Sequence, residues 1–256
     1  MKPQSTKWLR ILPLLALLAL AAAPARALEL DETFEQTYPL AAGGSVTLVN
    51  VNGSVRVEGW EKNSVAVYAV KRALREPRDL QRVSIAVEAA PGRVSIKTQY
   101  PANDPAGVEV EYRIKVPYQV ALSRVETVNG NVLIRGVEGT GELRTVNGNV
   151  DVFDSAGGFS GRATNGNVHV ELQRLAGAGE MSLESINGSV MLAVPPGAGA
   201  ALDVRSLNGE FRTELPIYTP SSAGREFRGQ LGRGGITVRL RTVNGGIEIV
   251  TLRATI

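Results

Sequence analysis

The hexapeptide TVNGNV occurs twice, at residues 127–132 and 145–150, so identical residues stand 18 positions apart. The dipeptide Asn-Gly itself recurs seven times, with successive gaps of 77, 18, 18, 22, 21 and 36 residues. Recurrence at a near-constant distance is typical of a protein built from stacked repeats. The copies are Asn52-Gly53, Asn129-Gly130, Asn147-Gly148, Asn165-Gly166, Asn187-Gly188, Asn208-Gly209 and Asn244-Gly245.

Apolar residues alternate with polar ones on both sides of each Asn-Gly pair. Around Asn129 they are Val125 before the pair and Val132 and Ile134 after it, and most other copies follow the same pattern. Such alternation indicates a half-buried strand. The residue two positions before each Asn is short, which suits a corner with a narrow interior. Each repeat is therefore predicted to be two strands joined at an Asn-Gly corner.

Two architectures fit this pattern, because a hairpin closed by an Asn-Gly turn places the same residues on one face as a stacked coil does. A hairpin turn accepts Asp or Gly almost as readily as Asn, yet all seven copies use Asn. A carboxamide both donates and accepts hydrogen bonds, so stacked Asn side chains can bond along an axis. This favours an all-β parallel β-solenoid, or β-helix, of ~18-residue coils with the Asn-Gly pairs as a structural ladder.

The rest of the chain suggests three parts. Residues 1–27 form a signal peptide, and residues 28–122 an N-terminal β section with the first Asn-Gly coil and an antiparallel meander that covers one end of the stack. Residues 123–256 form the solenoid repeats, with a loop at about 215–235. Gly161 and Ala163, at inward positions, predict one thinner coil. Gly-, Ala- or Pro-rich segments of variable length are expected at the corners opposite the Asn-Gly turns, at 135–141, 154–158, 175–179 and 195–199.

The N-terminus has the order of a secretory signal. Lys2, Lys7 and Arg10 precede a short apolar run, and cleavage is expected between Ala27 and Leu28. The run is too short to span a bilayer as a helix, so no membrane span is expected after its removal. The protein is thus predicted to be exported, to the periplasm, the cell surface or the medium.

Charge and cysteine content exclude some classes of protein. The first 27 residues contain four of the 28 Lys and Arg and none of the 25 Asp and Glu, so their loss changes the net charge from +3 to −1. Without a positive mature chain the electrostatic attraction that dominates nucleic-acid affinity is missing, and no nucleic-acid partner is expected. The absence of Cys means that stability comes from burial and backbone pairing.

The signal segment, the segment from Val57 to Trp60, the strand-rich region and the repeated TVNGNV together resemble the bacterial putative-adhesin family, a DUF4097-like domain of unknown function. The resemblance spans about residues 30–252. It implies a β-solenoid outside the cytoplasm, and it supplies no catalytic residues.

No constellation for catalysis is evident. A β-helix polysaccharide lyase or glycosidase would need paired carboxylates, and the nearest pair, Asp151 and Asp154, is read as a strand charge and a turn former. His169, the one histidine, is expected on the outward face and makes neither a triad nor a metal site. We expect no enzyme activity, cofactor or metal.

The residue three positions before each Asn is mostly charged, and is read as a solvated face in preference to a recognition stripe. The predicted function is adhesin-like interaction with an envelope polymer, a cell surface or a protein, with binding expected at the variable corners. The alternative is a periplasmic scaffold or regulatory partner.

Overall fold

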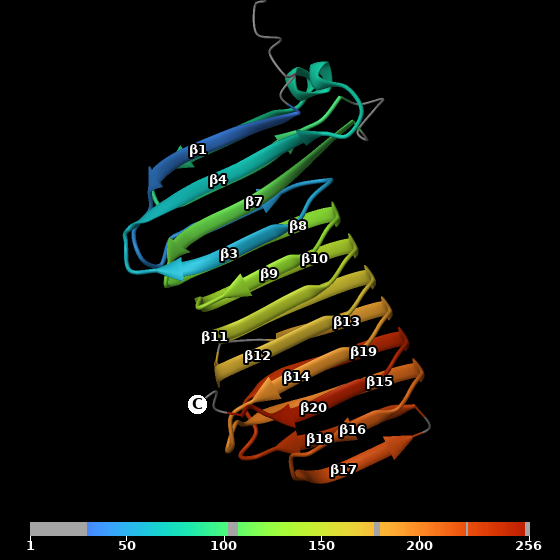
Figure 1. Ribbon diagram of the computed structural model, residues 1–256. Coiled ribbons are helices and arrows are strands. Elements are labelled where there is room, and N and C mark those ends of the chain that lie inside the picture. Colours follow the sequence, from blue (N-terminus) through green and yellow to red (C-terminus); the bar gives the residue numbers. More distant parts are fainter. Residues whose placement is uncertain (1–29, 102–106, 177–179, 224, 254–256) are drawn as a thin grey trace, which may run out of the picture.

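The computed structural model describes residues 30–101, 107–176, 180–223 and 225–253 of the 256-residue chain. Within these residues the chain is all-β, as predicted: it has twenty strands and one short 3₁₀ helix, and the strands form a single hydrogen-bonded sheet. Figure 1 shows the strands stacked along one long axis, from β1 (Asp31–Pro39) at one end to β17 (Ile217–Ala223) at the other.

The strands that lead into the Asn-Gly corners form one parallel ladder. Equivalent residues are in register, so that Thr145 lies beside Thr127 and Asn147 beside Asn129. In spatial order the ladder contains β2 (Ser45–Val49), β8 (Gln119–Asn129), β10 (Glu138–Asn147), the second half of β11 (Val150–Asn165), β13 (Glu180–Asn187), β19 (Ile236–Asn244) and β15 (Ala200–Asn208).

The strands that leave the corners form a second parallel ladder. In spatial order it contains β3 (Val55–Trp60), β9 (Val132–Arg135), the first half of β11, β12 (Val168–Leu175), β14 (Val190–Val194), β20 (Ile247–Thr251) and β16 (Phe211–Thr213). β7 (Val108–Pro117), which follows no Asn-Gly pair, lies parallel to β3 and extends this ladder. Antiparallel pairings occur at both ends of the stack. The sheet is therefore mixed.

The core lies between the two ladders. The inward side chains of Val125 and Leu143 from the first ladder, and of Val132 and Val150 from the second, are at most 1% exposed. Burying each such side chain contributes about 1.5–3 kcal/mol. The alternation read from the sequence thus fills one continuous interior.

The predicted thin coil is not hollow. A Cβ at Gly161 would lie 3.0 Å from a methyl group of Val168 and 3.2 Å from one of Val150, so neighbouring side chains already occupy that space. Two residues earlier in the same strand, Phe159 is fully buried, and its ring lies where a side chain at Gly141 would be. A large residue therefore compensates for the small ones.

At the N-terminal end the predicted antiparallel meander is only partly correct. β4 (Ser64–Ala73) does not pair with the next strand, β5 (Ser84–Ala90); it pairs antiparallel with β1 and β7, while β5 pairs with β6 (Arg93–Gln99), which lies parallel to β2. The 3₁₀ helix η1 (Pro77–Arg82) carries the chain between β4 and β5.

A buried lysine fixes this crossing. Lys71 on β4 donates hydrogen bonds from Nζ to the carbonyl oxygens of Leu80 (3.2 Å) and Val83 (3.1 Å), and it lies 2.9 Å from a carboxylate oxygen of Glu32. Its ammonium group is therefore satisfied although the residue is 7% exposed. Strands of the N-terminal section extend both ladders at this end, with β6 beside β2 and β7 beside β3.

The predicted loop at about 215–235 is wrong, because most of it is a β-hairpin. β17 pairs antiparallel with β18 (Glu226–Leu231), and β18 pairs antiparallel with the outer edge of β15. The chain then crosses β15 through a turn with positive φ at Gly232, Gly234 and Gly235, and β19 enters between β13 and β15. The last repeat along the chain is consequently not the last repeat in space.

The corners opposite the Asn-Gly turns are also more regular than expected. Residues 154–158 lie inside β11, and residues 138–141 begin β10. Glu138 is in register with Ala156, and Gly139 with Gly157. Asp154 has φ of +51°, and the register with β12 shifts between Val152 and Ala156. The change of direction is thus a bulge within a continuous strand. Of the segment 175–179, residues 177–179 lie outside the described residues.

Candidate functional site

The seven Asn-Gly corners lie above one another and are joined by a side-chain ladder. Asn147 donates from Nδ2 to Oδ1 of Asn129 at 2.7 Å, and its own Oδ1 accepts from Nδ2 of Asn165 at 2.8 Å. Bonds of 2.7–2.9 Å continue the row through the pairs Asn129 to Asn52, Asn187 to Asn165, Asn244 to Asn187 and Asn208 to Asn244. The structure thus brings all seven predicted asparagines together.

The glycine after each asparagine allows the coils to approach closely. A Cβ on Gly148, where φ is +154°, would lie 2.1 Å from the carbonyl oxygen of Gly130 in the neighbouring coil. Gly209, at the end of the stack, would meet the Gly245 oxygen at 1.9 Å. Backbone contact therefore excludes any side chain from this row, and its role is structural.

A second row of hydrogen bonds was missed in the sequence. The short residue two positions before Asn carries a hydroxyl in most coils, and this group donates to the Gly carbonyl of a neighbouring coil. Thr145 bonds to Gly130 at 2.8 Å, and Ser185 bonds to Gly166 at the same distance, whereas Ala163 has no hydroxyl. The preference for Thr and Ser over other small residues is the signal that reveals this row.

In the first coil Asn50 takes this position and connects the corner to a buried network. Its Nδ2 donates to the carbonyl oxygens of Gly53 (3.1 Å) and Val110 (2.9 Å), and its Oδ1 accepts from the Thr98 hydroxyl. That hydroxyl lies 2.6 Å from the hydroxyl of Tyr112. Burial raises the pKa of Tyr112 despite this hydrogen bond, so the phenol stays neutral.

The candidate catalytic residues do not form a site. Asp154 pairs with Arg135 at 3.2 Å, whereas Asp151 lies beside His169 on the next strand. Burial raises the pKa of Asp151, and the nearby His169 partly offsets the effect. The side chain of His169 is 27% exposed, so it is half-buried rather than exposed as expected, and its Nε2 lies 3.0 Å from Oε1 of Glu171.

Other predicted features bear on different residues. Ala27 and Leu28, at the expected cleavage site, lie outside the described residues. The part of the chain that is described contains no cluster of three or more His, Cys, Asp or Glu suited to a metal ion. Nor does any helix in it have the length and apolar character needed to cross a membrane.

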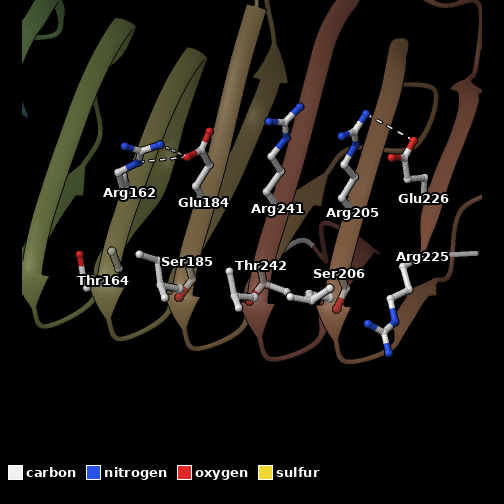
Figure 2. Close-up of a pocket in the computed structure, with 14 residues that line it drawn as sticks. Arg162, Thr164, Glu184, Ser185, Arg205, Ser206, Arg225, Glu226, Arg241 and Thr242 are labelled. Atoms are coloured by element: carbon white, nitrogen blue, oxygen red, sulfur yellow. Dashed lines mark hydrogen bonds and ion pairs between the residues drawn. The ribbon is translucent and has the colours of Figure 1, made fainter.

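The charged residues three positions before Asn form a continuous row across the C-terminal half of the first ladder. Neighbouring strands place Arg162 beside Glu184, Glu184 beside Arg241, Arg241 beside Arg205, and Arg205 beside Glu226. Figure 2 shows these five side chains along one face. Arg162 pairs with Glu184, and Arg205 lies 3.3 Å from Glu226.

An apolar row runs beside the charged row. The residues directly before Asn are also outward, and on β13, β19 and β15 they are Ile186 (45% exposed), Val243 (37%) and Leu207 (50%). A hollow of about 500 Å³, here named the C-terminal groove, lies along the two rows. It is lined by residues 162–164, 184–186, 205–207, 225–226 and 241–243.

Positive charge dominates the C-terminal groove. Its lining contains four arginines, Arg162, Arg205, Arg225 and Arg241, and two glutamates. Burial alone would raise the pKa of Glu184, but hydrogen bonds from Arg162 and Ser182 and the charges of Arg162 and Arg241 lower it. The glutamate is therefore ionised at neutral pH and the arginines remain in excess.

Comparison with known proteins gives distant similarities. The chain matches no protein-family model and no curated protein sequence. Among solved structures it is similar to a putative cell adhesion protein from Clostridium sporogenes, with a TM-score of 0.44 and 11% identity over 86% of this chain and 100% of that one. Putative adhesins from Bacteroides fragilis and Parabacteroides distasonis give TM-scores of 0.37 and 0.30, identities of 12% and 8%, and in each case coverage of 86% of this chain and 97% of theirs. Similarity this distant does not assign a function.

Proposed function

We propose that the protein is a non-enzymatic, exported, adhesin-like interaction protein that binds an envelope or surface component through the C-terminal groove. The observation that carries the proposal is the groove itself, in which a charged row and an exposed apolar row lie side by side on neighbouring strands. Charged and apolar groups that converge in a concavity are typical of binding sites. The groove replaces the variable corners as the proposed binding region, because much of the corner chain lies in regular strands.

The parallel part of the sheet is best described, in our proposal, as a β-solenoid with antiparallel strands added at both ends. The support is the register of equivalent residues from coil to coil and the asparagine ladder that follows it. A stack of this kind holds the groove residues other than Arg225 on regular strands instead of loops, so little ordering is needed when a partner binds.

Binding to envelope material tests the function. We expect the mature chain, residues 28–256, to co-sediment with isolated envelopes of the producing cells, and the double variant Arg205→Gln/Arg241→Gln to bind at least about tenfold more weakly. The matched control is Arg144→Gln, at the equivalent position of β10 but outside the groove. Equal binding by the double variant and the control would reject the groove as the binding region.

Localisation separates the proposed function from its alternative. Added protease is expected to degrade the protein on intact cells if it acts at the surface, whereas protection until the outer membrane is opened would favour a periplasmic scaffold or regulatory partner. Intact mass after recovery is expected to show that residues 1–27 have been removed.

The absence of enzyme activity is tested directly. Purified mature protein is expected to leave polymeric glycans intact, with and without Ca²⁺, because Asp154 is paired with Arg135 whereas Asp151 lies beside His169 on the next strand. Glycan cleavage that is lost in Asp151→Asn would establish a lyase or glycosidase instead.

A further inference from the structure

The centre of the C-terminal groove contains two arginines side by side, and one of them, Arg241, has only a long ion pair. Arg241 and Arg205 lie directly beside each other on adjacent strands, an arrangement of like charges that costs stability. Within the described residues, Arg241 has its ion pair with Asp203 alone, at a long 3.9 Å. Arg205 shares that same carboxylate at 3.6 Å and also lies 3.3 Å from Glu226.

Asp203 is shared among three arginines, of which Arg239 also pairs with Glu180 and Arg205 with Glu226, whereas Arg241 has no second ion pair among the described residues. Three guanidinium groups, those of Arg205, Arg239 and Arg241, lie within 3.6–3.9 Å of its carboxylate. The Nε atoms of all three arginines are buried, whereas the side chain of Arg241 is 40% exposed as a whole. The Nε atom of Arg241 has no hydrogen-bond partner among the described residues, and the one ion pair of this side chain is the long one to Asp203, so its guanidinium group can still take up an anion.

The apolar row determines what else the ligand must contain. Ile186, Val243 and Leu207 lie on three adjacent strands directly beside the arginines, and each is at least 37% exposed. The groove lining has no aromatic side chain on which a sugar ring would stack, which disfavours a glycan. Exposed aliphatic groups in a row instead match an aliphatic chain.

We propose that the C-terminal groove binds an anionic amphiphile, with a phosphate or carboxylate head between Arg241 and Arg205 and an aliphatic chain along Ile186, Val243 and Leu207. Guanidinium groups suit such heads because they donate paired, charge-assisted hydrogen bonds. The volume of about 500 Å³ lies within the usual range for small-molecule sites. This inference rests on the proposed interaction role and names its ligand class.

Dodecyl phosphate, below the concentration at which it forms micelles, is the probe. In calorimetric titration of the mature chain we expect saturable binding, with much weaker binding of inorganic phosphate, which lacks the chain, and of dodecyl maltoside, which lacks the charge. Arg241→Gln is expected to raise the Kd about tenfold or more, since a charge-assisted hydrogen bond is worth ~1.5–3 kcal/mol. Leu207→Ser is expected to raise it about threefold or more, because it removes buried apolar area.

Matched controls lie at equivalent positions on β10. Arg144→Gln and Val146→Ser change the same kinds of residue outside the groove lining and are expected to leave the Kd within about twofold. Circular dichroism confirms that each variant is folded. Absence of saturable binding, equally tight binding of dodecyl maltoside, or equal loss in Arg144→Gln would overturn the proposal.

Two further outcomes identify the source of the amphiphile. Binding to vesicles of phosphatidylglycerol and phosphatidylcholine that is lost in Arg241→Gln supports a membrane lipid, and binding of dodecyl phosphate alone supports a free amphiphile. Vesicle binding that is unchanged in Arg241→Gln would count against the groove as the lipid-binding site. Envelope binding that depends on the groove, combined with no binding of dodecyl phosphate, would remove this ligand and leave the proposed function standing.

Discussion

The coils that turn at Asn129, Asn147 and Asn165 stack in the order of the chain, whereas those that turn at Asn187, Asn244 and Asn208 do not. In the first group each coil rests on the one made just before it. In the second group the last coil along the chain lies between the two earlier ones. Both groups nevertheless have the same register and the same asparagine bond.

The difference shows that the repeat encodes how coils stack but not which coil follows which. Every asparagine side chain offers an amide group that donates and a carbonyl oxygen that accepts, so Asn187 can accept from Asn244 as readily as from Asn208. The order in which the coils stack must therefore be set by other parts of the chain. In the C-terminal group β18 occupies the outer edge of β15, and the glycine turn after it returns the chain to the inner edge.

The two groups also differ in surface chemistry. In the first, Arg144 lies between Glu126 and Arg162, so two arginines are adjacent here too, but Thr164 before Asn165 interrupts the apolar row. In the second, insertion of β19 brings Arg241 beside Arg205 and places Val243 beside Leu207. The C-terminal groove therefore depends on the exchanged order of the coils, which links this feature of the fold to the proposed binding role.

Engineered disulfides test the exchanged order with the largest expected effect. Met191 pairs with Glu248 across β14 and β20, and Cα atoms on adjacent strands lie about 4.8 Å apart, within the range that a disulfide bridges. Met191→Cys/Glu248→Cys should therefore cross-link almost completely under mild oxidation. Met191→Cys/Arg212→Cys should remain reduced, because β20 separates these strands.

Non-reducing electrophoresis and intact mass give the readout for this pair of variants, and the chain has no native cysteine to interfere. Asp151→Cys/His169→Cys, from coils in chain order, serves as the positive control. Efficient cross-linking of Met191→Cys/Arg212→Cys would mean that the coils follow chain order after all.

Glycine substitution sharpens the comparison between an inner coil and the end coil. Gly148→Ala inserts a Cβ against backbone held between two coils, and we expect a loss of about 3 kcal/mol in the free energy of unfolding. Gly209→Ala meets a similar clash, but its coil is outermost in the second ladder and can shift, so about 1 kcal/mol is expected.

Urea denaturation of the mature chain measures both glycine losses, and hydrogen exchange shows whether the Gly209→Ala effect stays local. Gly92→Ala is the control, since φ there is +73° and nothing lies within 4 Å of the added Cβ. A loss in Gly148→Ala no larger than in Gly92→Ala would show that stacking does not require glycine at the corner.

The local rules of the stack were readable in the sequence because each is repeated. Alternation predicted the inward residues, and the uniform use of Asn led to the expected ladder, which the hydrogen bonds of Asn147 now display. Features present once were not readable. The bulge at Asp154, the hairpin of β17 and β18 and the crossing held by Lys71 each depend on a single set of tertiary contacts.

The groove was missed for a related reason. Sequence position places Arg205 and Arg241 in the charged row but not beside each other, because they become neighbours only when β19 enters the stack. Read singly, each charge resembles part of a solvated face. Their adjacency, and the apolar row beside them, exist only in the folded arrangement.

Asparagine substitution tests the hydrogen-bond ladder, with a smaller expected loss of stability than glycine substitution at an inner coil. Asn147→Asp removes the donor to Asn129 and places a carboxylate beside that acceptor, so we expect a loss of about 1–2 kcal/mol. Asn147→Gly should cost less, because it introduces no charge. Asn208→Asp, at the end of the row, should also cost less, since its carboxylate can stay hydrated. Urea midpoints equal to wild type for Asn147→Asp would contradict the stacked-amide explanation.

Two carboxylates, one from each group of coils, give the smallest and most selective test. The pKa of Glu184 is lowered from 4.5, so its ionised form stabilises the fold above that pH, and the contribution is lost as the pH falls through the folded-state pKa. Glu184→Gln should therefore cost about 1 kcal/mol at pH 7 and almost nothing near pH 3.

The pKa shift of Asp151 has the opposite sign. Burial raises its pKa above 3.8, so its ionised form is disfavoured by folding, and wild-type stability recovers as the pH falls through the raised pKa. Since this side chain is partly exposed, Asp151→Asn should stabilise the protein at pH 7 by only about 0.3 kcal/mol, with the gain disappearing in acid. Urea denaturation of wild type and both variants between pH 3 and pH 7 measures how each variant's change in the free energy of unfolding depends on pH. Arg162 and Arg241 flank Glu184, whereas His169 alone offsets the burial of Asp151. If the stability change caused by each variant varies with pH in opposite directions, the arginines of the C-terminal group explain why the two pKa values shift in opposite directions. If both stability changes vary with pH in the same direction, the proposed electrostatic difference between the two groups of coils would be rejected.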